Sequence, residues 1–189
     1  MKNLNELFYD VILANELEGD VGAALRFSHA PGDKSGYSFG VCQFDVKNND
    51  TARKCLEEIG FSDEEIQGIV AETVDVKRFN GRLAAGAEVI QKYDEAQLTY
   101  CLDKAMNFGG AFGFPVESPS GVLGLADYVN QYGLPGSGSA RFYKSLGRPV
   151  NALDVLIFKL GSTKYGQEHG QDCRRRYGNI VKVLEAQNA

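Results

Sequence analysis

Metal-ligating side chains are scarce in this chain. It contains only two histidines, His29 and His169, and its four cysteines form no CxxC pair and no other zinc-ligand spacing. The sequence therefore predicts neither a metal centre nor a cofactor. We expect the cysteines to be structural thiols, mostly buried, at Cys42, Cys55, Cys101 and Cys173.

Long apolar runs and an excess of positive charge are also absent. No stretch approaches the roughly 20 apolar residues of a membrane-spanning helix, so we expect no membrane insertion. The net charge is −5, from 20 basic and 25 acidic residues, which disfavours nucleic acid as a partner because that affinity rests on neutralising phosphates. We expect the arginine run at 174–176 to be a solvated helix face, and local attraction to an anionic wall is the alternative.

The first residues do not form a secretory signal. One lysine is followed by polar and acidic residues, without an apolar segment or a small-residue cleavage site. We therefore expect synthesis in the cytoplasm, and a protein that acts on a cell wall would need another factor for its release.

The 189 residues, 43% of them hydrophobic, are enough to form one domain with a substantial core. Apolar residues recur at helical spacing over most of the chain, while the Pro/Gly/Ser-rich stretch 28–45 predicts a loop and a short hairpin. The expected fold class is mainly α with one small β-hairpin. Helices are predicted at 4–17, 50–59, 63–71 (after a Ser62/Glu65 capping box), 81–93, 95–107, 120–132, 140–146, 152–160 (after an Asn151 cap) and 171–186. We predict that the glycine-rich stretch 107–115 is a loop, whose three phenylalanines line a sugar groove or anchor the loop in the core.

Three carboxylates surround the most informative stretch. Asp33 and Asp45 lie on either side of a Gly/Ser/aromatic turn, and Glu18 ends the first predicted helix. Glycoside cleavage needs one carboxyl that holds a proton for the leaving oxygen and a second polar group, usually a carboxylate, that positions water or stabilises the oxocarbenium ion. The pattern indicates a glycosidase.

The motif Gly-Asp followed by Phe-Gly-Val-Cys-Gln-Phe-Asp (39–45) resembles the core motif of goose-type lysozymes and their lytic transglycosylase relatives. The resemblance spans residues 14–46, matches without a gap from Phe39 to Asp45, and requires short insertions before Phe39. Cys42 stands where the family has a Met-type residue, and the later Ala-Tyr-Asn motif of many transglycosylases is missing. Glu18-Gly19 is also similar to the Glu-Gly pair of phage T4-type lysozymes.

This resemblance implies a two-lobed lysozyme-like domain over residues 1–189, with a cleft between the hairpin region, about 28–46, and a C-terminal helical lobe. It implies hydrolysis of the MurNAc–GlcNAc β-1,4 bond of bacterial cell-wall polysaccharide by a monomer. Such a protein resembles a phage endolysin released by a holin, or an effector injected by a secretion system. An inhibitor or immunity protein is then a candidate partner.

The resemblance also implies roles for the carboxylates. Glu18 is the expected general acid, while Glu16 is an alternative that requires a longer insertion. Asp33 and Asp45 are the candidates for the base that positions water. Both also have ordinary structural explanations, Asp33 as a turn residue and Asp45 as a cap of the next helix.

Five further residues are candidate substrate contacts. Ser38 stands where T4-type enzymes carry a hydroxyl that helps to hold the water, and Tyr37 belongs to the Gly-Tyr hairpin that these enzymes share. Gln43 supports the motif or hydrogen-bonds sugar. Asn130 and Gln131, at the end of a predicted helix, have the amide chemistry of sugar-binding surfaces.

Several alternative functions stay open. Within the glycosidases these are lytic transglycosylation and chitin or chitosan hydrolysis. A peptidoglycan amidase or peptidase would use Cys42 as nucleophile and His29 or His169 as base, although Cys42 is predicted in a strand rather than at a helix N-terminus. A non-catalytic wall- or chitin-binding module is the last alternative.

Overall fold

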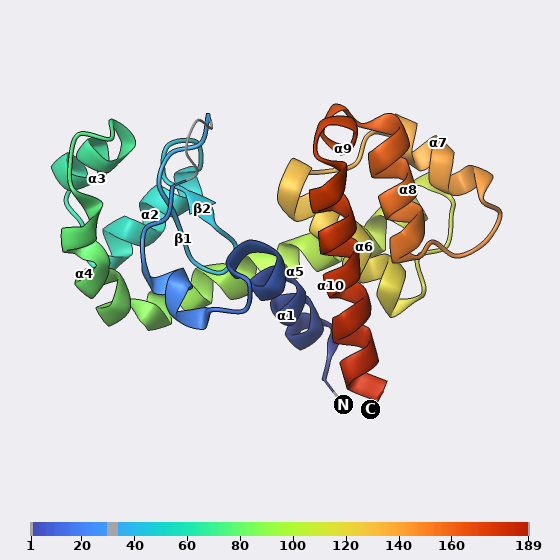
Figure 1. The fold of residues 1–189 in the computed structure, drawn as a ribbon, viewed down its shortest axis with the longest axis horizontal. Coiled ribbons are helices and arrows are strands. Elements are labelled where there is room, and N and C mark those ends of the chain that lie inside the picture. Colours follow the sequence, from blue (N-terminus) through green and yellow to red (C-terminus); the bar gives the residue numbers. More distant parts are fainter. Residues whose placement is uncertain (1, 30–33, 189) are drawn as a thin grey trace. The chain divides into compact units, whose positions relative to one another are not determined.

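The computed structural model describes residues 2–29 and 34–188 (Figure 1). These residues form ten α-helices, two 3-10 helices and one antiparallel hairpin of two short strands. The predicted fold class, mainly α with one small β-hairpin, is confirmed. The chain divides into two compact units, a terminal unit of Met1–Asn15 with Leu98–Ala189, and a hairpin unit of Glu16–Gln97.

The hairpin unit begins at the end of α1 (Leu4–Leu17) and ends within α5 (Ala87–Phe112). Between them lie η1 (Val21–Leu25), β1 (Ser38–Phe39), β2 (Phe44–Asp45), α2 (Asp50–Ile59), α3 (Asp63–Val70), η2 (Val76–Phe79) and α4 (Asn80–Ala85). In the hairpin, Ser38 pairs with Asp45 and Phe39 with Phe44. Both phenylalanines are buried, so the apolar pair fixes the register and leaves Ser38 and Asp45 on the other face.

The terminal unit contains the rest of α1 and α5 and five further helices. These are α6 (Pro119–Tyr132), α7 (Ser137–Ser145), α8 (Ala152–Ser162), α9 (Lys164–Glu168) and α10 (Gly170–Asn188). Its core includes the α1 stripe predicted from helical spacing, of which Phe8, Val11 and Ile12 are fully buried. No helix in the described part of the chain has the length and hydropathy of a bilayer-spanning segment.

The arginine run at 174–176 is not a uniformly solvated face, and that prediction was wrong. Arg174 and Arg175 are exposed, but Arg176 is 3% exposed and forms an ion pair with Asp127 of α6. Lys159 of α8, equally buried, lies 3.3 Å from the other oxygen of the same carboxylate. Because three neighbouring residues of a helix point in different directions, the run presents one cation to the core and two to solvent.

The glycine-rich stretch 107–115 is mostly helix, so the predicted loop and the predicted break near residue 94 were both wrong. Helix α5 continues to Phe112 and ends at Gly113, whose φ of 73° is the left-handed conformation of a C-terminal stop. The chain then folds back, and a Cβ on Gly109 would lie 2.5 Å from the Phe114 carbonyl oxygen. Glycine is needed there for close packing. Phe108 and Phe114 are buried against each other, so these two phenylalanines lie in the core, as the second alternative predicted, and do not line a surface groove.

The predicted helix starts that carried a capping signal are confirmed. Ser62 and Glu65 form a reciprocal capping box at the start of α3, and the Asn151 side chain accepts from the Asp154 amide at the start of α8. Helix α2 occupies the predicted range, and Gly60 ends it in the left-handed conformation.

Candidate functional site

Glu18 is exposed and directly follows the last residue of α1. Its φ of 52° lies in the left-handed region, and Gly19 continues there with φ of 88°. A glutamate in this conformation is unfavourable by roughly 1 kcal/mol relative to ordinary backbone. The chain leaves the helix through a turn in which the Asp20 amide donates to the Leu17 carbonyl over 2.8 Å. The carboxyl of Glu18 therefore stands on a tight, strained turn.

The segment after Glu18 is bonded to the hairpin. Asp20 caps η1 by accepting from the Ala23 amide, and the Ala24 carbonyl at the far end of η1 accepts from the Gly40 amide over 2.8 Å. Gly40 begins the turn that joins β1 to β2, with φ of 76°. The segment that directly follows Glu18 is thus hydrogen-bonded to the hairpin within the hairpin unit.

Ser38 lies on the polar face of the hairpin, which is the face that carries Ser38, Gln43 and Asp45. It pairs with Asp45 on one side, and on the other its amide and carbonyl exchange hydrogen bonds with those of Ser28, at 2.8 and 2.9 Å. The Ser28 hydroxyl donates to Gln43 Oε1 over 2.7 Å, and Gln43 Nε2 donates to the Gly40 carbonyl over 3.0 Å. The Gln43 amide retains one N–H and one lone pair beyond these bonds, which suits a sugar hydroxyl.

Asp45 is tied into the hairpin. Its Oδ1 accepts from the amides of Gly36 (3.1 Å) and Lys47 (2.9 Å), and its Oδ2 accepts from the Asn48 side chain (2.6 Å). Partial burial alone would raise the pKa of Asp45, but these hydrogen bonds outweigh it and hold the pKa below its usual value. Asp45 is therefore an ionised carboxylate near neutral pH, with acceptor capacity left on Oδ2.

Tyr37 lies at the base of the hairpin, where its carbonyl accepts from the Val46 amide over 2.9 Å. Its ring packs edge-on against His29, with centroids 5.0 Å apart. His29 Nε2 in turn lies 3.2 Å from the Glu72 carboxylate, which also pairs with Lys47 at 3.5 Å. The Tyr37 side chain is half-buried, so one part of its ring remains accessible to a ligand.

Sequence reasoning missed Asp94 of α5. This side chain is 3% exposed, and its two oxygens accept from the amides of Val41 (2.9 Å) and Cys42 (2.8 Å) in the hairpin turn. Burial is the largest influence and raises the pKa of Asp94. A signal was available, because Asp94 occupies the i, i+4 stripe between the buried residues Ile90 and Leu98.

Cys42 lies in the turn, and its predicted position in a strand was wrong. Its side chain is 8% exposed and its Sγ lies 3.8 Å from the Asp94 carbonyl. A nucleophilic thiolate is usually lodged at a helix N-terminus or beside a cation, whereas this thiol faces a carbonyl and a buried carboxyl. All four cysteines are buried, as expected.

The other predicted residues lie elsewhere. Asp33 lies outside the described residues. Asn130 and Gln131 belong to α6 of the terminal unit, where Gln131 Oε1 accepts from Lys159 Nζ over 2.5 Å and Asn130 Oδ1 lies 4.0 Å from Cys101 Sγ. The structure thus brings Ser38, Gln43 and Asp45 together on the hairpin and involves Gln131 in a buried polar cluster.

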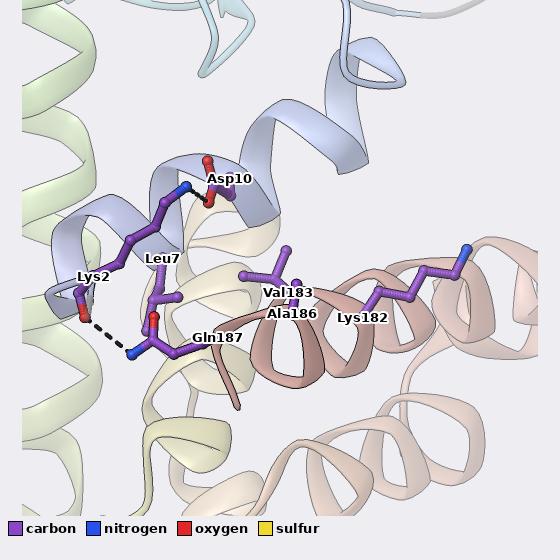
Figure 2. Close-up of a pocket in the computed structure, with 7 residues that line it drawn as sticks. All are labelled: Lys2, Leu7, Asp10, Lys182, Val183, Ala186 and Gln187. Atoms are coloured by element: carbon purple, nitrogen blue, oxygen red, sulfur yellow. Dashed lines mark hydrogen bonds and ion pairs between the residues drawn. The ribbon is translucent and has the colours of Figure 1, made fainter. Parts of the chain in front are cut away.

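One pocket of about 510 Å³ lies in the terminal unit, away from these residues in the sequence. Figure 2 shows it between the N-terminal part of α1 and the end of α10, with Lys2 directed at Asp10 and Gln187 bonded to the Lys2 carbonyl. None of the predicted site residues lines it. Within the described residues, no group of three or more His, Cys, Asp or Glu side chains is arranged to hold a metal ion.

Comparisons with models of known protein families, with curated protein sequences and with solved structures give no match for this chain.

Proposed function

We propose that the chain is a glycosidase of bacterial cell-wall polysaccharide, a muramidase with Glu18 as its general acid. The observation that carries the proposal is that the segment directly after the Glu18 turn is hydrogen-bonded to the polar hairpin. The Gly40 amide donates to Ala24 of η1, so the carboxyl on its strained turn and the Ser38/Gln43/Asp45 face form one structural piece. A proton donor and polar groups on a common support are what glycoside cleavage requires.

In this mechanism Glu18 donates its proton to the glycosidic oxygen as the bond to the anomeric carbon breaks. The positive charge that develops on the sugar is balanced by a second carboxylate, which also orients the attacking water. Asp45 has the right protonation state for that role, because its hydrogen bonds keep it ionised. Asp33 remains the other candidate, and Ser38 and Gln43 are proposed to hold the water and the sugar hydroxyls.

The test is lysis of outer-membrane-permeabilised Gram-negative cells by the wild type and by Glu18→Gln, with mass spectrometry of the released muropeptides. Glu16→Gln is the matched control, since it removes a neighbouring carboxyl from the same helix end. We expect wild type and Glu16→Gln to release fragments with reducing ends, while a folded Glu18→Gln protein releases almost none.

Other outcomes point to specific alternatives. Anhydro-muramyl ends would make the protein a lytic transglycosylase, in which the 6-hydroxyl of the substrate replaces water. Lysis by Glu18→Gln at the wild-type rate would overturn the proposal, and Glu16 and Cys42 would be the next residues to change. Binding of wall polysaccharide without any cleavage would indicate a wall-binding module. We further propose that a holin or a secretion system delivers the protein to the wall.

A further inference from the structure

We propose that Asp94 is a positioning residue of this site, which holds the turn of residues 40–43 so that the Gln43 amide is presented to the substrate. The inference rests on the proposed glycosidase function and assigns to it a residue that the sequence motif does not contain. Asp94 lies on α5, about 50 residues after the turn, in the same hairpin unit.

The contact is specific to a carboxylate. Oδ2 of Asp94 accepts from the Val41 amide and Oδ1 from the Cys42 amide, so two consecutive backbone donors converge on one side chain. Both residues are buried, so their amides have no water to replace these acceptors. An ionised carboxylate offers an acceptor on each oxygen, whereas an amide offers one acceptor and presents donors at the other position.

The approach of Asp94 explains the glycine before these two residues. A Cβ on Gly40 would lie 3.0 Å from Asp94 Oδ1 and 3.0 Å from the Phe44 ring, and the φ of 76° already disfavours any other residue. The Phe-Gly pair of the motif therefore has a physical reason here, since it admits the α5 carboxylate to the turn.

The turn carries this constraint to Gln43. The Gly40 carbonyl accepts both from the Gln43 amide (3.2 Å) and from Gln43 Nε2 (3.0 Å), and Gln43 itself has φ of 52°. Asp94 fixes the turn from the α5 side and Ser28 fixes the Gln43 side chain from the other. Loss of the Asp94 acceptors would release the two residues between Gly40 and Gln43, and the side-chain amide would lose its orientation.

The groups around Asp94 make the arrangement dependent on pH. Burial raises the pKa of Asp94, and the charge of Glu95 on α5 raises it further. The hydrogen bonds from the Val41 amide and from the amide and thiol of Cys42 lower this pKa. Burial raises the pKa of the Cys55 thiol on α2, and the Asp94 carboxylate raises it further. Glu58 and Lys92 form an ion pair near that thiol. Protonation of Asp94 relieves a buried charge but removes one acceptor, so the turn is held above this pKa and loosened below it.

The first experiment measures kcat and KM on sonicated soluble peptidoglycan for wild type, Asp94→Asn, Gln43→Ala and the double variant. We expect Asp94→Asn to lower kcat/KM about ten- to hundredfold, as for a misplaced contact, and the double variant to be no worse than the more impaired single variant. Additive losses would mean that Asp94 and Gln43 act independently of each other and would overturn the inference. Glu88→Gln, which removes an exposed carboxyl elsewhere on α5, is the matched control and should leave kcat/KM unchanged.

The second experiment needs no variant. The amide proton shifts of Val41 and Cys42, followed by NMR, should titrate together with the Asp94 carboxyl, and KM should rise as the pH falls through the same midpoint. Amide shifts that do not titrate, or a KM independent of that midpoint, would overturn the inference even if Asp94→Asn fails to fold.

The two proposals fail in different ways. A wild type without glycosidase activity would overturn the proposed function, and with it the assignment of Asp94. An active wild type, an inactive Glu18→Gln and a fully active Asp94→Asn would overturn the Asp94 assignment alone.

Discussion

Arg176 and Asp127 form a fully buried ion pair in the terminal unit, in which Nη2 lies 2.5 Å from Oδ1. Lys159 approaches the second carboxylate oxygen at 3.3 Å, so one anion serves two cations. The Lys159 ammonium also donates to Gln131 over 2.5 Å and lies 5.4 Å from the centre of the Tyr132 ring. Helices α6, α8 and α10 are thereby joined through a single carboxylate.

We expect Asp127→Asn to be strongly destabilising. The change leaves two buried cations without an anion, which typically lowers the free energy of unfolding by about 3–5 kcal/mol. Urea denaturation followed by circular dichroism measures the loss. Asp50→Asn is the control, because the Asp50 side chain is 83% exposed in its pair with Arg53 and the change should be within about 1 kcal/mol.

Asp127 also predicts a dependence of stability on pH. Burial alone would raise the pKa of Asp127, but the charges of Arg176 and Lys159 outweigh it and lower the pKa to about 2. Because the folded pKa lies below the unfolded one, the stabilisation is complete above pH ~4 and is lost as the pH falls toward 2, on the order of 2 kcal/mol in all. The slope of unfolding free energy against pH in this window should decrease in Asp127→Asn. An unchanged slope would assign the acid sensitivity to other carboxylates.

Two helical glycines should respond in opposite directions to alanine. A Cβ on Gly121 would collide with the Val150 carbonyl oxygen, whereas a Cβ on Gly178 of α10 meets nothing within 4 Å. We expect Gly121→Ala to destabilise the protein by about 1–3 kcal/mol and Gly178→Ala to stabilise it by roughly 0.5–1 kcal/mol. Thermal unfolding distinguishes them, and a stable Gly121→Ala protein would contradict the packing of α6.

Asp45→Asn tests whether Asp45 only stabilises the hairpin or also acts in catalysis. Asparagine keeps the Oδ1 acceptor for the Gly36 and Lys47 amides, so we expect the hairpin to fold. The negative charge is lost, and lysis should fall by about tenfold or more if the charge supports the oxocarbenium ion. Lysis at the wild-type rate by a folded Asp45→Asn protein would move the catalytic role to Asp33.

Cys42→Ser distinguishes the glycosidase from a cysteine hydrolase. The hydroxyl can donate to the Asp94 carbonyl as the thiol does, so the turn should be preserved. We expect lysis at the wild-type rate, measured by the clearing of permeabilised cells. A folded Cys42→Ser protein without lytic activity would show that the thiol is the nucleophile.

Local signals in the sequence predicted much of the fold. The apolar stripe of α1, the capping boxes at Ser62 and Asn151 and the Gly60 stop act within one turn of helix, so they can be recognised without tertiary information. Gly109 shows the limit of such reasoning. Its preference for loops was overridden by the packing of Phe108 against Phe114, a contact between the helix and the segment that follows it.

Only those parts of the candidate site whose residues lie close together in the sequence could be predicted. The hairpin and the juxtaposition of Ser38 with Asp45 follow from alternating apolar residues around a glycine turn. The roles of Asp94 and Arg176 depend on partners about 50 residues away, so composition and spacing indicated only a polar residue in an apolar stripe and a basic run.

The left-handed backbone at position 18 is unfavourable for the glutamate that occupies it. Glycine or asparagine would adopt the same φ with less strain. If Glu18→Gly proves to be a more stable but inactive protein, the difference in free energy measures what the molecule gives up to keep an acid at that turn.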